Sequence, residues 1–275
     1  MFTLNCKGQL LTITEPIVMG ILNTTPDSFF ENSRFNNQDA LLQKAEEMIQ
    51  EGATILDVGG QSTRPNSTKV TEEEELHRVM PAIEKLHLKF PTQIISVDTF
   101  YARVAKEAIQ AGASIVNDVS AGSIDENLLP IVAELGVPYV LMHMKGNPQT
   151  MQQNPQYNNV TLDVFDALSF KIKDLYGLGI KDVIIDPGFG FGKTIAHNFQ
   201  LLRELSFFLQ LEKPLMIGLS RKGTIYKTLN TTADNALNGT TVVHTMALLK
   251  GATILRVHDV KEAAEAIKLY LAYKQ

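Results

Sequence analysis

The sequence has a single cysteine, Cys6, and lacks any long apolar run. One thiol excludes a disulfide framework and any metal site built from several thiolates within one chain. No stretch approaches the roughly 20 consecutive apolar residues that a membrane-spanning helix needs. Residues 1–14 contain no apolar segment long enough for the central region of a secretory signal peptide. We therefore expect a cytoplasmic protein, in keeping with the low cysteine content.

An excess of basic residues is also missing. The chain has 25 Lys and Arg against 30 Asp and Glu, a formal net charge of −5. Nonspecific binding to nucleic acid or to an anionic membrane needs a basic face, so neither partner is expected. An anionic substrate would have to be held by a local cluster of positive side chains. With 44% apolar and 20% charged residues, the 275-residue chain has the composition of a globular protein.

The apolar residues are arranged in short runs that predict strands. Residues 2–14 read as a hairpin around a Lys7-Gly8 turn. After Pro16, eight apolar runs alternate with longer segments of helical period, as in a (β/α)₈ TIM barrel. The runs are Ile17–Leu22, Ile55–Val58, Ile94–Val97, Ile115–Val116, Tyr139–Met142, Val183–Ile185, Leu215–Ile217 and Ile254–Val257. Residues 1–15 are expected to form a hairpin that belongs to the same domain as the barrel of residues 16–275.

Helix signals and an internal repeat support this fold. Thr71 followed by Glu74, and Ser123 followed by Glu126, have the spacing of capping boxes. Near copies of one Gly-Ala-Thr/Ser-Ile junction begin at Gly52, Gly112 and Gly251, with looser versions at Gly136 and Gly179. Each predicts a helix that ends at glycine before a buried strand. Repeated βα units favour a parallel barrel, and a doubly wound open sheet is the alternative.

Polar residues stand at the end of all eight runs or just after it. They are Asn23, Asp57, Asp98, Asn117, His143, Asp186, Ser220-Arg221-Lys222, and Arg256 with His258. In a barrel these positions share the carboxyl-terminal face, where active sites lie. Gly and Ala stand at the opposite ends of the strands. The polar residues are therefore concentrated at the face of the barrel where an active site is expected.

The positive and the negative groups suggest two kinds of contact. The cations Arg64, Arg221, Lys222, Arg256 and His258, with the donors Asn23, Thr63 and Ser220, predict a pocket for phosphate or diphosphate. For any one arginine, a surface ion pair is the competing interpretation. The acids Asp57, Asp98 and Asp186, beside Asn117, would either bind Mg²⁺ or accept N–H groups from a flat, nitrogen-rich heterocycle. Four histidines fall in helical segments and are interpreted as structural: His77, His87, His197 and His244.

The predicted site also includes a glycine-rich loop and two unusually long loops. Asp186–Lys193 has three glycines and two phenylalanines after a strand, and Pro187 stands where a P-loop needs glycine. It is therefore a glycine-rich loop with aromatic walls. The loops 23–37 and 59–70 are longer than usual connections and are expected to close over a substrate, with Phe29, Phe30 and Pro65 as apolar groups.

Eight segments, taken in order from about residue 16 to 275, together resemble the dihydropteroate synthase family, TIM barrels of the pterin-binding type. They are Ile21-Leu-Asn-Thr-Thr-Pro-Asp-Ser-Phe29, Asp57-Val-Gly-Gly-Gln-Ser-Thr-Arg-Pro65, Ser96-Val-Asp-Thr-Phe100, Asn117-Asp118, Leu141-Met-His-Met-Lys-Gly-Asn-Pro148, Asp186–Lys193, Ser220-Arg-Lys222 and Arg256-Val-His-Asp-Val260. The resemblance implies a transferase of folate biosynthesis. It would condense 6-hydroxymethyl-7,8-dihydropterin pyrophosphate with 4-aminobenzoate by dissociative displacement at the pterin methylene, releasing pyrophosphate.

The resemblance also implies roles for matching residues. The pterin would be bound by Asp98, Asn117, Met142, Asp186, Lys222 and Arg256. The diphosphate would be bound by Asn23, Thr63, Arg64, Arg256 and His258, with Asn23 also a ligand of the cofactor Mg²⁺. The aminobenzoate would be surrounded by Phe29, Thr63, Pro65, Phe189, Phe191, Ser220 and Lys222. Catalysis would depend on Asp98, Asp186, Lys222 and Arg256. A homodimer and competition by sulfonamides at the aminobenzoate pocket are further implications.

The chain departs from the family pattern in both long loops. Glu31-Asn32-Ser33 stands where the family often has Asp-Gly-Gly, and Gln61 and Asn66 stand where Glu and Gly are usual. These changes bear on loop flexibility and affinity more than on the reaction. Two alternatives stay open: a pterin-dependent methyltransferase of the same superfamily, which would not need an arginine-rich diphosphate pocket, and a pterin-binding paralogue without catalysis.

Overall fold

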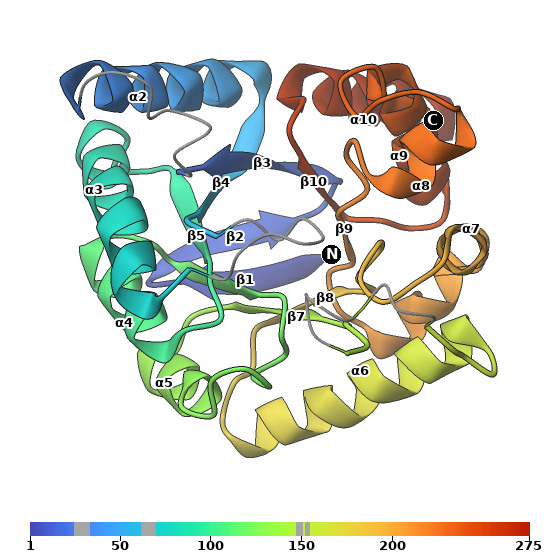
Figure 1. Ribbon diagram of the computed structural model, residues 1–275, viewed down its shortest axis with the longest axis horizontal. Helices are drawn as coiled ribbons and strands as arrows, with labels where there is room; N and C mark the ends of the chain where they lie inside the picture. Colours follow the sequence, from blue (N-terminus) through green and yellow to red (C-terminus); the bar gives the residue numbers. More distant parts are fainter. Residues whose placement is uncertain (25–33, 62–69, 147–150, 152–154) are drawn as a thin grey trace.

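A barrel of parallel strands inside a ring of helices makes up most of the molecule (Figure 1). The computed structural model describes residues 1–24, 34–61, 70–146, 151 and 155–275. The strands are β1 (Phe2–Cys6), β2 (Gln9–Ile13), β3 (Ile17–Asn23), β4 (Ala53–Gly59), β5 (Ile94–Asp98), β6 (Ile115–Asp118), β7 (Tyr139–Met142), β8 (Val183–Asp186), β9 (Met216–Ile217) and β10 (Ile254–Val257). The helices are α2 (Arg34–Glu51), α3 (Glu72–Lys89), α4 (Ala102–Ala111), α5 (Leu128–Leu135), α6 (Val160–Gly177), α7 (Ile195–Arg203), the 3₁₀ helix η1 (Leu205–Leu211), α8 (Gly223–Thr228), α9 (Leu237–Leu249) and α10 (Val260–Lys274).

The eight-stranded sheet closes on itself. Its order is β8-β7-β6-β5-β4-β3-β10-β9, with parallel pairing throughout. The two outer strands of this order meet through a parallel bridge between Ile185 and Leu215. The Ile185 amide also donates to the Pro214 carbonyl at 2.9 Å. The predicted barrel is therefore confirmed, and the open doubly wound sheet is wrong.

Side chains of the barrel strands alternate between two hydrophobic clusters. One apolar side chain from each strand points inward, and together they fill the barrel: Met19, Ile55, Ile94, Ile115, Val140, Ile184, Met216 and Ile254. Their neighbours along the strands, such as Leu56, Val116 and Leu255, face outward and pack with the apolar faces of the helices. Alternation of this kind follows from the two-residue period of a strand.

The N-terminal hairpin closes the amino-terminal end of the barrel. Lys7 and Gly8 both have positive φ, 56° and 92°, as a type I′ turn requires. Leu4, Cys6, Leu11 and Ile13 from β1 and β2 belong to the same cluster as the inward barrel residues. Burial raises the pKa of the Cys6 thiol to about 12, as expected for a structural cysteine. The hairpin thus shares its core with the barrel.

Helix ends confirm most of the local predictions and correct one. Gly52, Gly112, Gly136, Gly179 and Gly251 all have positive φ at the predicted junctions. The Thr71 side chain accepts the Glu74 amide at 3.3 Å and caps α3.

The second predicted capping box is wrong. Helix α5 begins only at Leu128, and the Ser123 hydroxyl instead donates to the Ser120 carbonyl at 2.7 Å. A capping box is present elsewhere, between Thr194 and His197 at the start of α7. Helix α2 begins at Arg34, so the first long loop is shorter than the predicted 23–37.

None of the helices that the structure describes is both long and apolar enough to cross a bilayer. The cytoplasmic location expected from the sequence stays a prediction.

Candidate active site

Polar side chains form a layer above the apolar filling of the barrel. Because side chains on one face of a strand recur every two residues, four polar side chains point inward two positions after an inward isoleucine. They are Asp57 after Ile55, Asn117 after Ile115, Asp186 after Ile184 and Arg256 after Ile254. Asp98 ends β5 and is paired in register with Asn117. The predicted gathering of strand-end residues at one face is thus present. Since these groups are mostly buried, each needs a partner or a ligand.

Arg256 occupies the centre of this layer and is held by two carboxylates. Its Nε donates to Asp57 Oδ2 at 2.6 Å, and its Nη2 donates to Asp98 Oδ2 at 2.5 Å. The same Asp57 oxygen accepts Asn117 Nδ2 at 3.0 Å. Asp57 is fully buried, and its Oδ1 has no hydrogen-bond partner among the described residues. Asp57 therefore orients both an arginine and an amide, a role that the sequence left unassigned.

Burial and charge shift the pKa values of this cluster in opposite directions. Burial raises the pKa of Asp98 to about 7, although the Arg256 guanidinium opposes the shift. Burial lowers the pKa of Arg256, but the carboxylates of Asp57 and Asp98 outweigh it, so that the net change is a rise. Arg256 thus stays charged, while Asp98 titrates near neutral pH.

Lys222 and Asp186 form a second charged pair beside the first. A side chain built at Gly218 would have its Cβ 3.6 Å from Lys222 Nζ and 3.8 Å from Asp186 Oδ2, so both groups face this glycine. Burial lowers the pKa of Lys222 to about 8, against the effect of Asp186. Burial also raises the pKa of Asp186, which Lys222 and the Gly188 amide oppose. The pair offers one acceptor and one donor within a short distance of Arg256.

The loop Asp186–Lys193 folds tightly over the end of β8. Gly188, Gly190 and Gly192 have φ of 72°, 84° and 64°, which side chains rarely adopt. A Cβ at Gly188 would collide with the His143 carbonyl, and one at Gly192 would lie 2.5 Å from the Lys145 carbonyl. The glycines therefore let this loop lie directly against the end of β7.

The two loop phenylalanines have different surroundings. Phe191 packs with Met142, Phe100, Val119 and Met151 in a small apolar cluster. Its ring centroid lies 4.7 Å from Lys222 Nζ, in a cation–π contact.

The Phe189 side chain is fully buried in the outer cluster between strands and helices. Its carbonyl accepts Lys222 Nζ at 2.6 Å. The group of Phe189 that contacts Lys222 is thus its backbone carbonyl, and its expected contact with the aminobenzoate stays a prediction.

Other predicted residues lie at the same end of the barrel. Ser220 Oγ lies 3.0 Å from His258 Nδ1 and accepts the His258 amide at 3.2 Å. Asn23 ends β3 and is half-buried. Arg221 does not join the predicted anion pocket, because its Nε and Nη2 donate to Asp259 at 2.8 Å each. The ion-pair interpretation is therefore correct for Arg221.

Five predicted residues lie outside the part of the chain that the structure describes. They are Phe29, Phe30, Thr63, Arg64 and Pro65. The residues on either side of the second long loop are described, and hydrogen bonds from the Gln61 side chain connect the two sides. Its Nε2 donates to the Val70 carbonyl and its Oε1 accepts the Val70 amide, each at 3.0 Å.

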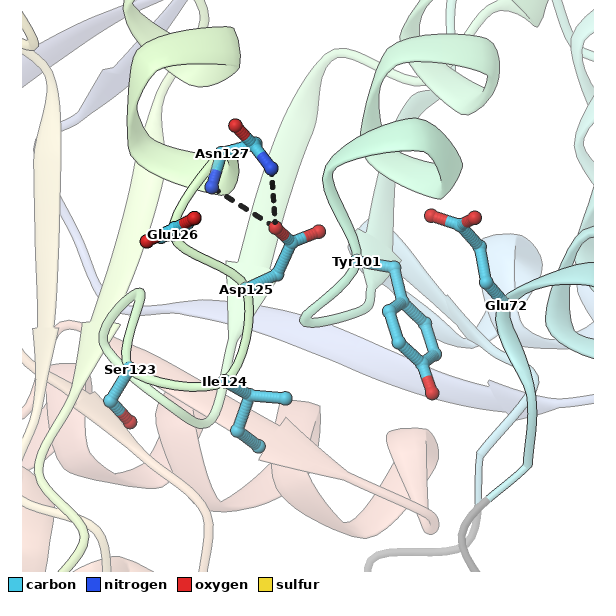
Figure 2. Close-up of a pocket in the computed structure, with 7 residues that line it drawn as sticks. All are labelled: Glu72, Tyr101, Ser123, Ile124, Asp125, Glu126 and Asn127. Atoms are coloured by element: carbon cyan, nitrogen blue, oxygen red, sulfur yellow. Dashed lines mark hydrogen bonds between the residues drawn. The ribbon is translucent and has the colours of Figure 1, made fainter.

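A hollow of about 500 Å³ lies at the rim of the same face (Figure 2). It is lined by Glu72, Tyr101, Ser123, Ile124, Asp125, Glu126 and Asn127. Asp125 Oδ2 accepts the Ala102 amide at 2.7 Å, and its Oδ1 accepts the Asn127 amide at 3.0 Å. The acidic lining makes this hollow unsuited to an anionic substrate, which favours the Arg256 and Lys222 region as the site.

Within the described ranges, no three His, Cys, Asp or Glu side chains are grouped so that they could hold a metal ion. The helical histidines His77, His87, His197 and His244 are placed in α3, α7 and α9, as expected.

Comparison with known proteins identifies relatives of the whole barrel. The model of the pterin binding enzyme family matches residues 19–258. The dihydropteroate synthase of Haemophilus influenzae is 43% identical over 271 residues, which cover 98% of each chain. The dihydropteroate synthase of Yersinia pestis, solved in complex with a sulfonamide drug, superposes with a TM-score of 0.93 at 41% identity over 99% of both chains. The Xanthomonas albilineans synthase in complex with 7,8-dihydropteroate gives a TM-score of 0.89 at 38% identity, also over 99% of both chains.

Proposed function

The chain belongs to the family of pterin-binding enzymes, and from this premise we propose how its barrel performs the dihydropteroate synthase reaction. This transferase reaction of folate synthesis joins 6-hydroxymethyl-7,8-dihydropterin pyrophosphate to 4-aminobenzoate and releases pyrophosphate. The 43% identity to a named synthase over 98% of both chains favours it over the pterin-dependent methyltransferase. Sulfonamides compete for the aminobenzoate site. The observation that carries the mechanism is the buried polar layer around Arg256.

The pterin is recognised along its polar edge and on its two faces. Asp98 and Asp186 accept its N–H groups, Asn117 can both donate and accept, and Lys222 donates to its acceptor atoms. The side chains of Met142 and Arg256 contact the ring faces. Support for this assignment comes from burial, since Asn117 and Asp186 are 3% and 4% exposed. Buried polar groups of this kind discriminate strongly against ligands that leave them unpaired.

The diphosphate is held by positive and polar groups at the ends of the first and last barrel strands. Arg256 lies in β10, His258 follows it and Asn23 ends β3, while Thr63 and Arg64 come after β4 in the sequence. Arg256 is already oriented by Asp57 and Asp98, so little reorganisation is needed when charge develops on the departing oxygen.

The second substrate lies over the glycine-rich loop. Phe191 and Ser220, together with Phe29, Thr63 and Pro65, surround the ring of the 4-aminobenzoate. Lys222, which lies 4.7 Å from the Phe191 ring centroid, attracts its carboxylate and also reaches the pterin. Lys222 therefore sits at the boundary between the two substrates.

Displacement at the pterin methylene is dissociative. The C–O bond breaks first, and its electron pair leaves with the diphosphate. The resulting cation is delocalised into the pterin ring beside the carboxylates of Asp98 and Asp186. The neutral aniline nitrogen then donates its lone pair to form the C–N bond and releases a proton to the diphosphate or to water. Electrostatic placement and substrate orientation account for the rate.

Mg²⁺ fits this site as a companion of the diphosphate. Mg²⁺ often binds through one or two protein groups plus substrate phosphates and water. The described residues offer the side-chain oxygen of half-buried Asn23 for this purpose and no acidic cage, in line with that pattern. When bound, the ion supplies charge neutralisation for the leaving diphosphate.

The enzyme is a homodimer in this proposal, with α9 and α10 as the contact face. Several large apolar side chains on these helices are exposed: Val242, Met246, Leu249, Leu269 and Tyr273. A groove of about 560 Å³ runs between the two helices. Exposed apolar patches mark interaction surfaces. Sedimentation of the wild type and of Leu269→Lys tests this, with Leu88→Lys on α3 as the control. We expect a monomer only for Leu269→Lys; a monomeric wild type, or a dimeric Leu269→Lys, would contradict the proposal.

Product formation tests the catalytic proposal. The enzyme is incubated with dihydropterin pyrophosphate and Mg²⁺, with and without 4-aminobenzoate. We expect 7,8-dihydropteroate and pyrophosphate in equal amounts when both substrates are present. Pterin binding without any product would identify the chain as the non-catalytic paralogue instead.

A further inference from the structure

Lys193 ends the glycine-rich loop, and its side chain turns back beneath it. Its Nζ lies 2.9 Å from the Gly188 carbonyl and 3.0 Å from the Phe191 carbonyl, both within the loop. It also lies 3.0 Å from Nδ1 and 3.3 Å from the carbonyl of His143, just beyond β7. Lys193 is 2% exposed, so it does not present its ammonium to solvent.

Burial lowers the pKa of Lys193 to about 7, and in its protonated form these contacts use the full donor capacity of the ammonium group. Three protons are shared among the carbonyls and the ring nitrogen, which must be an acceptor in this arrangement. Burial, followed by the nearby Lys193 charge, lowers the pKa of His143 to about 3, so its ring is neutral at neutral pH. Loss of the ammonium would leave buried carbonyls without a donor, which is costly inside a protein.

The segment that Lys193 fixes contains groups assigned to the reaction. Between its two anchored carbonyls, at Gly188 and Phe191, lies the Phe189 carbonyl, which accepts Lys222 Nζ at 2.6 Å. The Phe191 ring contacts the same ammonium at 4.7 Å. Lys193 therefore holds two of the groups that place Lys222.

Asp186 is held differently. It pairs with Met142 in the sheet, and its carbonyl accepts the His143 amide at 3.0 Å. Its backbone is thus fixed by the barrel, and the loop reaches only its side chain, where Oδ1 accepts the Gly188 amide at 2.7 Å.

We propose that Lys193 is a positioning residue for the aminobenzoate half of the site, acting through the loop on Lys222 and Phe191. The inference rests on the proposed function, because it concerns the second substrate of that reaction. Lys193 contacts neither substrate. Removing its ammonium frees the Phe189 carbonyl and the Phe191 ring to move, while the pterin contacts of Asp98, Asn117 and Arg256 stay anchored to the strands.

Steady-state kinetics of Lys193→Met test this assignment. The substitution keeps an unbranched chain and removes the donor. We expect kcat to fall at least tenfold and KM for 4-aminobenzoate to rise at least fivefold, with KM for dihydropterin pyrophosphate changed less than threefold. Lys181→Met, an exposed lysine before β8, is the matched control and should behave as wild type.

The pattern of constants separates positioning from a purely structural role. A structural role would lower the amount of folded enzyme and leave both KM values unchanged. If Lys193→Met does not fold, Lys193→Arg tests the positioning role instead. The larger, planar guanidinium keeps the positive charge but cannot donate to the same set of acceptors with the geometry of an ammonium group. We expect at least a fivefold loss of kcat/KM for 4-aminobenzoate. Wild-type constants in the folded variant would overturn the positioning role, whereas a wild type that forms no dihydropteroate would overturn the proposed function itself.

Discussion

Arg256 Nε donates to Asp57 Oδ2 at 2.6 Å, joining side chains that are 199 residues apart in the chain. The bond connects β10 with β4 across the mouth of the barrel. Asp57 is fully buried, and the oxygen that accepts Arg256 also accepts Asn117. One carboxylate thus orients a residue assigned to the diphosphate and another assigned to the pterin.

Replacing Asp57 by asparagine should separate this orienting role from folding. Asp57→Asn keeps the shape but removes the charge that faces Arg256, so we expect a folded protein with kcat reduced at least tenfold. Removing one well-aimed donor outright typically costs roughly 2.7–4 kcal/mol of transition-state stabilisation, and Asp57→Asn disturbs such a donor without removing it. Asp166→Asn, on the exposed face of α6, is the control. A kcat for Asp57→Asn within twofold of the wild-type value would mean that Arg256 does not depend on Asp57.

The pH dependence of kcat/KM should be bell-shaped with a narrow optimum. Burial raises the pKa of Asp98 to about 7, so this carboxylate gains a proton and loses function as the pH falls below 7. Burial lowers the pKa of Lys222 to about 8, so the ammonium loses its proton as the pH rises above 8. The optimum is therefore expected between these values.

Lys222→Arg identifies the alkaline limb of this profile. Arginine stays protonated throughout the accessible range, so the variant should lose that limb while keeping the acidic one. Rates are normalised to each protein's maximum, since the larger side chain lowers activity. An alkaline limb at the wild-type position in the variant would show that another group titrates there.

Glu75 should make the protein less stable as the pH rises. Gln61 Nε2 donates to its Oε2 at 2.6 Å, and burial raises the Glu75 pKa to about 7. Because the folded state holds the proton between the unfolded pKa of about 4.3 and about 7, the free energy of unfolding falls across this window.

We expect Glu75→Gln to stabilise the protein at pH 8 by up to roughly 3 kcal/mol, and by much less at pH 5. Thermal or denaturant unfolding at both pH values measures this, with the exposed Glu84→Gln of the same helix as the control. Equal stability of Glu75→Gln and wild type at pH 8 would argue that Glu75 is not a strained buried acid.

The hairpin offers a matched pair of leucines for testing its role in the core. Leu11 is 7% exposed and packs into the barrel end, whereas its neighbour Leu10 is 68% exposed. Leu11→Ala should lower the free energy of unfolding by roughly 2–4 kcal/mol. Leu10→Ala should change it by less than about 0.5 kcal/mol. Similar losses of stability in both variants would contradict the conclusion that the hairpin packs against the core and closes the amino-terminal end of the barrel.

The fold could be predicted because its signals are local and repeated. Eight apolar runs, five junction glycines with positive φ and a polar residue at or just after the end of every run all follow from the geometry of one βα unit. The candidate site followed from the same rule, since the carboxyl ends of barrel strands share one face.

What the sequence could not predict depends on the contacts that each side chain makes in the folded protein. Ser123 and Glu126 have capping spacing, but Ser123 bonds to Ser120 and the helix begins later. No local signal distinguished Phe189, whose ring packs into the outer cluster, from Phe191, whose ring contacts the Lys222 ammonium. For Asp57 and Lys193, the deciding partners are Arg256 and His143, which no local pattern connects to them.

The central claim is that the buried polar layer around Arg256 and Lys222 carries the condensation. Its most direct test is the turnover of dihydropterin pyrophosphate and 4-aminobenzoate to dihydropteroate by Arg256→Ala and Lys222→Ala, with circular dichroism to confirm folding. We expect folded proteins in which turnover falls at least a hundredfold, about the loss of one well-aimed donor. Near-wild-type turnover by both folded variants would contradict it.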